Sequence, residues 1–367
     1  MKRTKPPFRA DHVGSLLRTG PIKEARAKRE KGEISAAQLK EIEDREIPKI
    51  IKKQEEAGLQ AITDGEERRA WWHLDFLEGL DGTESYDMPQ GVQFHGTQTK
   101  AKGVRTIGKL GFTGHPMLEH FKFLKAHTGQ TPKMTIPSPS ALYGRAASRV
   151  AVSEKAYPDL DEFFDDLGKT YKKAIRGFYD AGCRYLQLDE VFMVLLCDPE
   201  QHKALKARGD DPDKMPGIYA DVYNAALKDL PADMTITMHL CRGNFRSTFV
   251  GSGGYEPIAE TLLSKINVHG YFMEYDTERA GGFEPLRFLP KGKSVVLGLI
   301  TSKFPQLESK DAIKRRIDAA AKFAPLDQLC LSPQCGFAST EEGNILTEDE
   351  QWRKLRHVVE IAEEVWG

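Results

Sequence analysis

The residues with the clearest chemical potential lie in three short motifs in the C-terminal half of the sequence. His239 and Cys241 form a His-x-Cys pair, Glu274 ends the run Tyr-Phe-Met-Glu, and Cys335 lies in Ser-Pro-Gln-Cys-Gly. Two thiols, an imidazole and a carboxylate are side chains that bind zinc in a tetrahedral site. A lone His-x-Cys pair also fits a core histidine beside an inert cysteine. The other two residues each end or follow an apolar run, which favours the metal site.

A second group of polar residues suits the binding of a substrate ammonium group. Asp-Gly-Glu at 64–66 and Asp-Glu at 189–190 also lie at the ends of apolar runs. Paired carboxylates bind an ammonium group through charge-assisted hydrogen bonds. The alternative is that these acids cap helices or pair with Arg68 and Arg69. The residue types alone leave both interpretations open.

The cysteine content argues against a disulfide framework. Five cysteines are spread over 367 residues, and an odd, widely spaced set fits a reducing compartment. Cys183, Cys197 and Cys330 lie inside apolar patterns, which is typical of buried structural thiols. No secretory signal follows the basic residues 1–9, and no apolar run approaches the roughly 20 residues of a membrane span. We therefore expect a cytoplasmic protein with no membrane segment.

The overall charge gives no sign of a polymeric partner. Lys and Arg number 53, Asp and Glu number 54, and the formal net charge is −1, with 40% hydrophobic residues. A nucleic-acid-binding protein usually carries a basic surplus. We therefore expect small-molecule partners and no nucleic acid.

A repeated unit positions the motifs. Short apolar runs that end in polar or glycine residues occur at 8–13, 59–63, 133–137, 184–189, 234–239, 270–274, 294–299 and 328–332. Helical patterns lie at 21–31, 35–57, 159–181, 212–230, 255–264, 310–323 and 347–365. Eight alternating units predict an α/β fold, the (β/α)8 TIM barrel, in which all C-terminal strand ends meet at one mouth. An open doubly wound sheet is the structural alternative.

Residues 90–112 break this rhythm. Alternation of Val, Phe, Thr and Gly residues between Val92 and Gly108 predicts a β-hairpin inserted after the second unit. No linker, low-complexity run or sequence repeat marks a domain boundary. We therefore predict a single catalytic domain spanning 1–367, with the hairpin beside the barrel mouth.

Together these motifs resemble the catalytic half of cobalamin-independent methionine synthase, in the short single-barrel branch of that family. The resemblance covers nearly the whole chain. It rests on His-Val-Gly-Ser at 12–15, Asp-Gly-Glu at 64–66, Leu-Gln-Leu-Asp-Glu at 186–190, His-x-Cys at 239–241, Glu274, and Ser-Pro-Gln-Cys-Gly at 332–336, in the family's order. It implies a (β/α)8 barrel and a Zn²⁺ cofactor held by His239, Cys241, Glu274 and Cys335.

The resemblance also implies the reaction, the methylation of the homocysteine thiol to form methionine. Glu66 and Asp189 would be the catalytic-site residues that bind the amino group, and Ser15 would lie near the carboxylate. Arg242, which directly follows Cys241, is a further candidate for substrate binding. Zinc would act as a Lewis acid that stabilises the thiolate, because a free alkyl thiol is mostly protonated near pH 7.

Two departures from the family leave the methyl donor open. The family's folate-stacking tryptophan is missing from segment 134–143, and its acidic histidine is missing from Gly-Leu-Ile-Thr-Ser at 298–302. Trp71, Trp72 or Tyr143 would have to supply another aromatic surface. The candidate donors are a methyl-folate, a methylcorrinoid with its corrinoid protein as a partner, or a simple S- or N-methyl compound.

Three rival functions remain at this stage. They are zinc-dependent alkylation of another thiol, such as coupling of coenzyme M to an epoxide, a metal-free barrel of the uroporphyrinogen decarboxylase type, and a non-catalytic zinc- or thiol-binding barrel. Glu66 and Asp189 suit an amino-acid ammonium group but have no role towards a sulfonate thiol. The sequence does not predict the oligomeric state.

Overall fold

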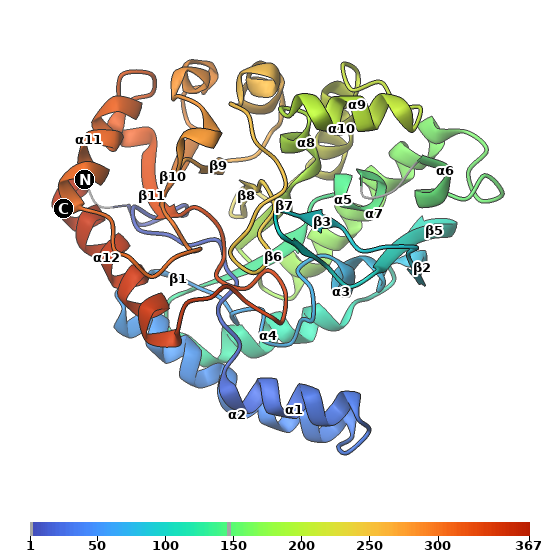
Figure 1. Ribbon diagram of the computed structural model, residues 1–367, viewed down its shortest axis with the longest axis horizontal. Helices are drawn as coiled ribbons and strands as arrows, with labels where there is room; N and C mark the ends of the chain where they lie inside the picture. The colour runs from blue at the N-terminus through green and yellow to red at the C-terminus, as the bar shows by residue number, and fades with distance from the viewer. Residues whose placement is uncertain (1–2, 145–147) are drawn as a thin grey trace.

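A curled parallel sheet forms the centre of the computed structural model, which describes residues 3–144 and 148–367 (Figure 1). Neighbouring strands in the sheet are all parallel. In spatial order they are β1 (Ala61–Ile62), β6 (Thr131–Pro137), β7 (Tyr185–Glu190), β8 (Thr235–Leu240), β9 (Gly270–Glu274), β10 (Ser294–Ile300) and β11 (Leu329–Pro333).

Seven of the eight predicted strand runs form this sheet. All residues of β7, β9, β10 and β11 are buried. Strands covered on both faces have nearly continuous apolar sequences, which is the pattern used for the prediction. The α/β class and the parallel sheet are confirmed, and the open doubly wound order does not occur.

The first predicted run, 8–13, lies between the two edge strands of the curled sheet. Ala10 forms a parallel bridge with Leu331 of β11, and the N–H of Asp11 donates to the Leu331 carbonyl at 3.0 Å. On its other side, Nε2 of His12 lies 3.0 Å from the carbonyl oxygen of Ala61 in β1. The run therefore contacts both edge strands, through one backbone bridge to β11 and a side-chain contact with β1, and does not form a regular strand.

Helices surround the sheet (Figure 1). The α-helices are α1 (Gly20–Glu30), α2 (Ala36–Glu56), α3 (Leu74–Leu77), α4 (Pro116–His127), α5 (Ser140–Gly144), α6 (Ser148–Ala151), α7 (Leu160–Asp180), α8 (Phe192–Leu195), α9 (Pro199–Ala207), α10 (Met215–Ala226), α11 (Lys310–Ala320) and α12 (Glu348–Trp366). Short 3-10 helices are η1 (Glu256–Ile258), η3 (Glu278–Ala280), η4 (Glu284–Phe288) and η5 (Leu326–Gln328), and η2 (Thr261–Lys265) is a π-helix.

The long helices follow from their sequences. Phe163, Leu167, Tyr171, Ala174 and Phe178 of α7 are buried at three- and four-residue spacing, which produces one apolar face against the sheet. Ser35 caps α2 through a reciprocal capping box with Gln38 at the first turn of the helix. The helix predicted at 255–264 forms as a continuous helical stretch over 256–265, which begins as the 3-10 helix η1 and ends as the π-helix η2.

The inserted segment differs from the predicted hairpin at 90–112. The antiparallel partner of β5 (Lys102–Gly111) is β2 (Asp81–Asp87), which lies before the predicted segment. Only β3 (Gln93–Phe94) and β4 (Thr97–Gln98) pair within the segment. The β2 sequence Asp-Gly-Thr-Glu-Ser-Tyr-Asp has no apolar alternation, so the sequence pattern did not identify it.

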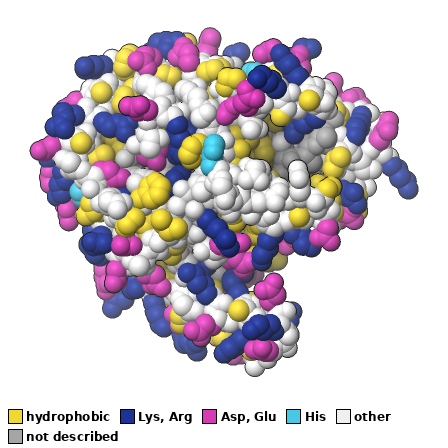
Figure 2. Space-filling view, viewed as in Figure 1, with side chains coloured by type: hydrophobic (Ala, Val, Ile, Leu, Met, Phe, Trp, Pro, Cys, Tyr) yellow, Lys and Arg dark blue, Asp and Glu magenta, His cyan; other side chains and the backbone are white. Residues whose placement is uncertain are grey.

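The surface carries both charge signs. Figure 2 shows Lys and Arg side chains intermingled with Asp and Glu over the visible face, in keeping with the balanced composition. Among the described residues, no helix is long and apolar enough to cross a membrane.

A buried ion pair ties the first run to the sheet. Nζ of Lys133 in β6 lies 3.2 Å from Oδ1 of Asp11, and both side chains are fully buried. Oδ2 of Asp11 accepts hydrogen bonds from the Phe8 backbone at 3.1 Å and from the Tyr185 hydroxyl at 2.8 Å. Asp11 thus links run 8–13 to β6 and β7.

We expect Asp11→Ala to lower the free energy of unfolding by about 3–5 kcal/mol, because it leaves the Lys133 ammonium buried without a counter-charge. Adding Lys133→Met should recover part of this loss. Urea denaturation measures both. The control is Asp180→Ala in the exposed pair with Arg176, which should change stability little. An equally small effect of Asp11→Ala would contradict the assignment.

Candidate metal centre and active site

Three strand ends bring four metal-competent side chains to one point. His239 lies near the end of β8, Cys241 directly follows β8, Glu274 ends β9, and Cys335 lies two residues beyond β11. Their ligand atoms all lie within 4.8 Å of one another, and all four side chains are buried. The structure thus brings together the four residues that the sequence predicted as metal ligands.

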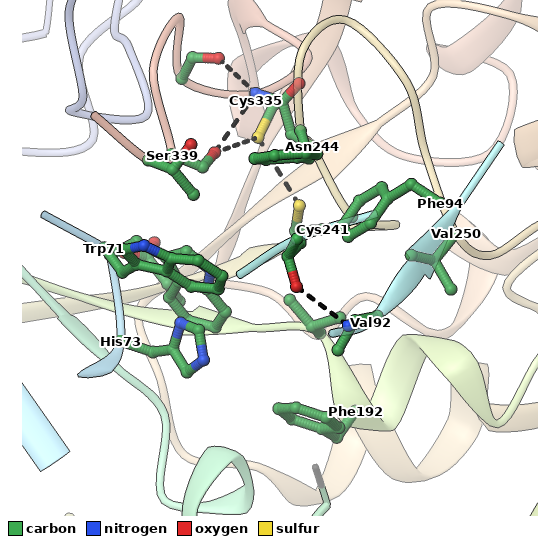
Figure 3. Close-up of a pocket in the computed structure, with 18 of the residues that line it drawn as sticks. Trp71, His73, Val92, Phe94, Phe192, Cys241, Asn244, Val250, Cys335 and Ser339 are labelled. Carbon is green, nitrogen blue, oxygen red and sulfur yellow. Dashed lines mark hydrogen bonds between the residues drawn. The ribbon is translucent and has the colours of Figure 1, made fainter. Parts of the chain in front are cut away.

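The geometry of the cluster fits zinc. The Sγ atoms of Cys241 and Cys335 face each other 3.6 Å apart (Figure 3). A disulfide would need about 2.0 Å, whereas tetrahedral zinc with bonds of about 2.3 Å to sulfur separates two thiolates by about 3.8 Å. Neither ring nitrogen of His239 has a hydrogen-bond partner among the described residues. Buried nitrogens of this kind call for a ligand, so the cluster is a candidate metal centre.

The protonation of the cluster also suits a cation. The hydrogen bond between the two thiols lowers the pKa of Cys335 well below its ordinary value and raises the pKa of Cys241. Burial raises the pKa of Glu274. Thiols and carboxylates bind metals in their deprotonated forms, so a cation would displace protons from this cluster as it binds.

Two hydrogen bonds fix the Glu274 carboxylate. The backbone N–H of Arg242 donates to Oε1 at 3.1 Å, and the guanidinium of Arg279 donates to Oε2 at 2.9 Å. No motif in the sequence identified Arg279 as a site residue. Its only signal there was its position five residues after Glu274.

A buried polar network holds the loop after β11 against the loop after β8. Nδ2 of Asn244 donates to the Gly336 carbonyl at 2.8 Å, and Nζ of Lys303 donates to Oδ1 of Asn244 at 2.8 Å. Oγ of Ser302 also donates to the Gly336 carbonyl, at 2.9 Å. Contacts of this kind orient metal ligands from behind.

A cavity of about 300 Å³ lies beside the cluster (Figure 3). His239, Cys241 and Cys335 contribute to its lining. The rest of the lining combines polar side chains with apolar ones, and the apolar ones include Trp71, Trp72, Val92, Phe94, Phe192, Leu195, Phe245 and Val250. A cavity that combines apolar walls with convergent polar groups suits a small-molecule ligand, and the inserted segment supplies part of its wall.

The predicted substrate residues Ser15, Glu66 and Asp189 all line this cavity. Oε1 of Glu66 accepts a hydrogen bond from Oγ1 of Thr135 at 2.8 Å and lies 3.4 Å from Nη1 of Arg69. A Cβ at Gly336 would lie 1.9 Å from Oγ of Ser15. The close approach of Ser15 to the loop that bears Cys335 therefore requires glycine.

Both acidic groups are poised to bind a cation. Burial raises the pKa of Glu66 and raises the pKa of Asp189 to about 7. Oε2 of Glu66 is buried and has no hydrogen-bond partner among the described residues. An ammonium group in the cavity would satisfy this oxygen and stabilise the ionised carboxylates.

Arg242 does not line the cavity. Its guanidinium carbon lies 4.4 Å from the centre of the Tyr255 ring. The position of the Arg242 side chain therefore does not support the predicted contact with substrate. Tyr143 also lies outside the lining, with its hydroxyl donating to Oδ1 of Asp210 at 2.5 Å. Of the three aromatic residues proposed to contact a donor, Trp71 and Trp72 line the cavity.

Glu190, Arg68 and three of the cysteines have structural roles. The Glu190 carboxylate accepts hydrogen bonds from the Ser138 and Ser140 hydroxyls and from the backbone at the start of α8. Arg68 pairs with Glu43 and Asp44. The three cysteines that were predicted to be structural are all buried, namely Cys183, Cys197 and Cys330.

Comparisons with known proteins show the family of the chain. Residues 8–364 match the family model described as the catalytic domain of cobalamin-independent synthase. The uncharacterized Bacillus subtilis protein YxjH is 55% identical over 100% of this chain and 96% of its own length. A solved structure titled a putative vitamin-B12 independent methionine synthase from Listeria monocytogenes is 43% identical, covers 100% of both chains and has a TM-score of 0.80.

A longer relative is the 5-methyltetrahydropteroyltriglutamate–homocysteine methyltransferase of Bacillus velezensis. It is 22% identical over 96% of this chain, which spans 42% of that enzyme's length. The fold, the site and these matches define an enzyme of the methyltransferase class. The chain belongs to the cobalamin-independent synthase family, as a member of its catalytic-domain group.

Proposed function

We propose that this protein is a zinc-dependent methyltransferase that transfers a methyl group to the sulfur of homocysteine and forms methionine. The observation that carries the proposal is the convergence of four ligand atoms within 4.8 Å beside a cavity that also contains two carboxyl groups. Zn²⁺ would be held by His239, Cys241, Glu274 and Cys335. The catalytic unit would be a single (β/α)8 barrel spanning 1–367, closed by run 8–13 and decorated by the insert that contains 90–112.

The remaining residues of the cavity would orient homocysteine. Glu66 and Asp189 would bind its ammonium group through charge-assisted hydrogen bonds, and Ser15 would lie near its carboxylate. The apolar wall, with Phe94 and Phe245 5.5 Å apart between ring centres, would exclude water from the reacting sulfur. The chemistry that zinc supplies when bound is stabilisation of the homocysteine thiolate, the nucleophile.

The methyl donor is the partner to be identified by experiment. Zinc-loaded protein and homocysteine are incubated with methyl-folates of different glutamate length, with methylcobalamin or a methylated corrinoid protein, and with simple S- and N-methyl compounds. Methionine formed in one of these incubations identifies the donor. The absence of methionine from all of them would contradict the proposed function.

Wild-type protein is expected to contain about one zinc ion per chain, and Cys335→Ser and His239→Ala should lose zinc and activity together, because each removes a ligand. Metal content is measured by mass spectrometry after gel filtration. Cys330→Ser is the matched control, since this buried thiol lies against the Pro7 carbonyl, away from the cluster. A zinc-free variant with full turnover would refute the assignment.

Asp189→Asn and Glu66→Gln should each raise the KM for homocysteine by about 10–100-fold, the cost of losing a charged hydrogen bond, while zinc content stays unchanged. The test substrate is 4-sulfanylbutanoate, which lacks the amino group. Its KM should be the same in wild type and variants. An equal rise for both thiols would show that the carboxylates do not bind the ammonium group, and efficient use of coenzyme M would favour the rival thiol.

A further inference from the structure

Arg279 contacts the candidate metal centre from outside the cavity. It lies in η3, and its Nη2 donates to Oε2 of Glu274 at 2.9 Å. The guanidinium side chain is 11% exposed and the carboxylate is fully buried. Solvent screens an enclosed ion pair much less than a surface pair, so this contact acts strongly on the charge and orientation of Glu274.

The arginine is itself held from several sides. Nη2 also donates to Oδ1 of Asp276 at 3.2 Å, and the guanidinium carbon lies 4.5 Å from the centre of the Phe249 ring. The Arg279 carbonyl accepts a hydrogen bond from the N–H of Gly253 at 3.0 Å. Phe249 and Gly253 belong to the segment that returns from the loop after β8. A guanidinium fixed in this way loses little further conformational freedom when it holds a carboxylate.

The second oxygen of Glu274 is tied to the same loop. It accepts a hydrogen bond from the N–H of Arg242, the residue after Cys241, and the Arg242 carbonyl accepts one from the N–H of Val250 at 3.0 Å. The contacts therefore form a closed ring from Cys241 through Glu274 and Arg279 back to the loop. Two of the four predicted ligands, Cys241 and Glu274, are therefore held by the same set of contacts.

We propose that Arg279 is a positioning residue of the metal centre, which holds the Glu274 carboxylate in its ligating orientation and balances part of the negative charge of the ligand set. This inference rests on the proposed zinc-dependent function. Each carboxylate oxygen has further lone pairs after accepting one hydrogen bond, so both bonds are compatible with metal binding. Arg279 does not line the cavity, and it acts on the centre through Glu274.

The test is the zinc affinity of the full-length protein, measured by competition with a chromophoric chelator. Arg279→Leu should weaken zinc binding by about 10–100-fold, the usual effect of losing an outer partner of a metal ligand. In a Glu274→Ala background the same change should alter affinity by less than about twofold, because no carboxylate remains to be positioned. Arg279→Lys, which keeps the charge, should recover part of the affinity.

The matched control is Arg287→Leu. Arg287 lies in the neighbouring helix η4 and pairs with Glu256 on the surface, so its loss should leave zinc affinity unchanged. The absorption spectrum of the cobalt-substituted protein gives a second readout, because its d–d bands report ligand geometry. These bands should shift in Arg279→Leu and stay the same in Arg287→Leu.

The outcomes separate this inference from the proposed function. Equal zinc affinity in wild type and Arg279→Leu would overturn the role of Arg279 and leave the proposed function intact, as would an equal loss in the presence and absence of Glu274. A wild-type protein that binds no zinc would overturn the proposed function. If Arg279→Leu does not fold, Arg279→Gln replaces it, and unchanged affinity in that variant would overturn the inference.

Discussion

The parallel register of β8, β9, β10 and β11 is the constraint on which the candidate site depends. Leu240 pairs with Met273, which places Cys241 beside Glu274 at the next step. Gly298 pairs with both Glu274 and Ser332, so the loop that bears Cys335 begins at the same level. A slip of one residue in any pair would turn a ligand to the opposite face of the sheet. Backbone hydrogen bonding thus determines whether four side chains reach one point.

Burial then determines the electrostatics. Two thiolates and a carboxylate around a divalent cation would leave one net negative charge in a buried site, where uncompensated charge is costly. Two basic side chains reach this region through hydrogen bonds, Arg279 through Glu274 and Lys303 through Asn244. These two side chains therefore hold the segments that bear the ligands, and they also offset the negative charge of the ligand set. Among the described residues, the hydrogen bonds of Arg279 and Lys303 do not involve the sulfur atoms of the two cysteine ligands.

The periodicity of the sequence predicts most of the sheet, because strands buried on both faces produce continuous apolar runs such as 294–299. Chemistry and position at strand ends predicted the four candidate ligands, whereas the role of Glu66 and Asp189 was implied by the resemblance to the family. The pairing of β2 with β5 was not predictable, since polar β2 has no alternation and is stabilised by its partner. The direction of Arg242 and the contact of Arg279 with Glu274 depend on loops. Loop geometry follows from contacts between distant segments, which a one-dimensional pattern does not contain.

Backbone strain is concentrated beside the same site. Among the described non-glycine residues, positive φ occurs at Glu66, Arg246, Ser247 and Asp229. Glu66, with φ 60°, lines the cavity, and its N–H donates to Oδ1 of Asp64 at 2.9 Å. Ser247 is held by the side chain of Asn344 at 2.8 Å. Such conformations persist where surrounding hydrogen bonds over-determine them. At Glu66 the strained backbone belongs to a residue whose carboxylate lines the cavity.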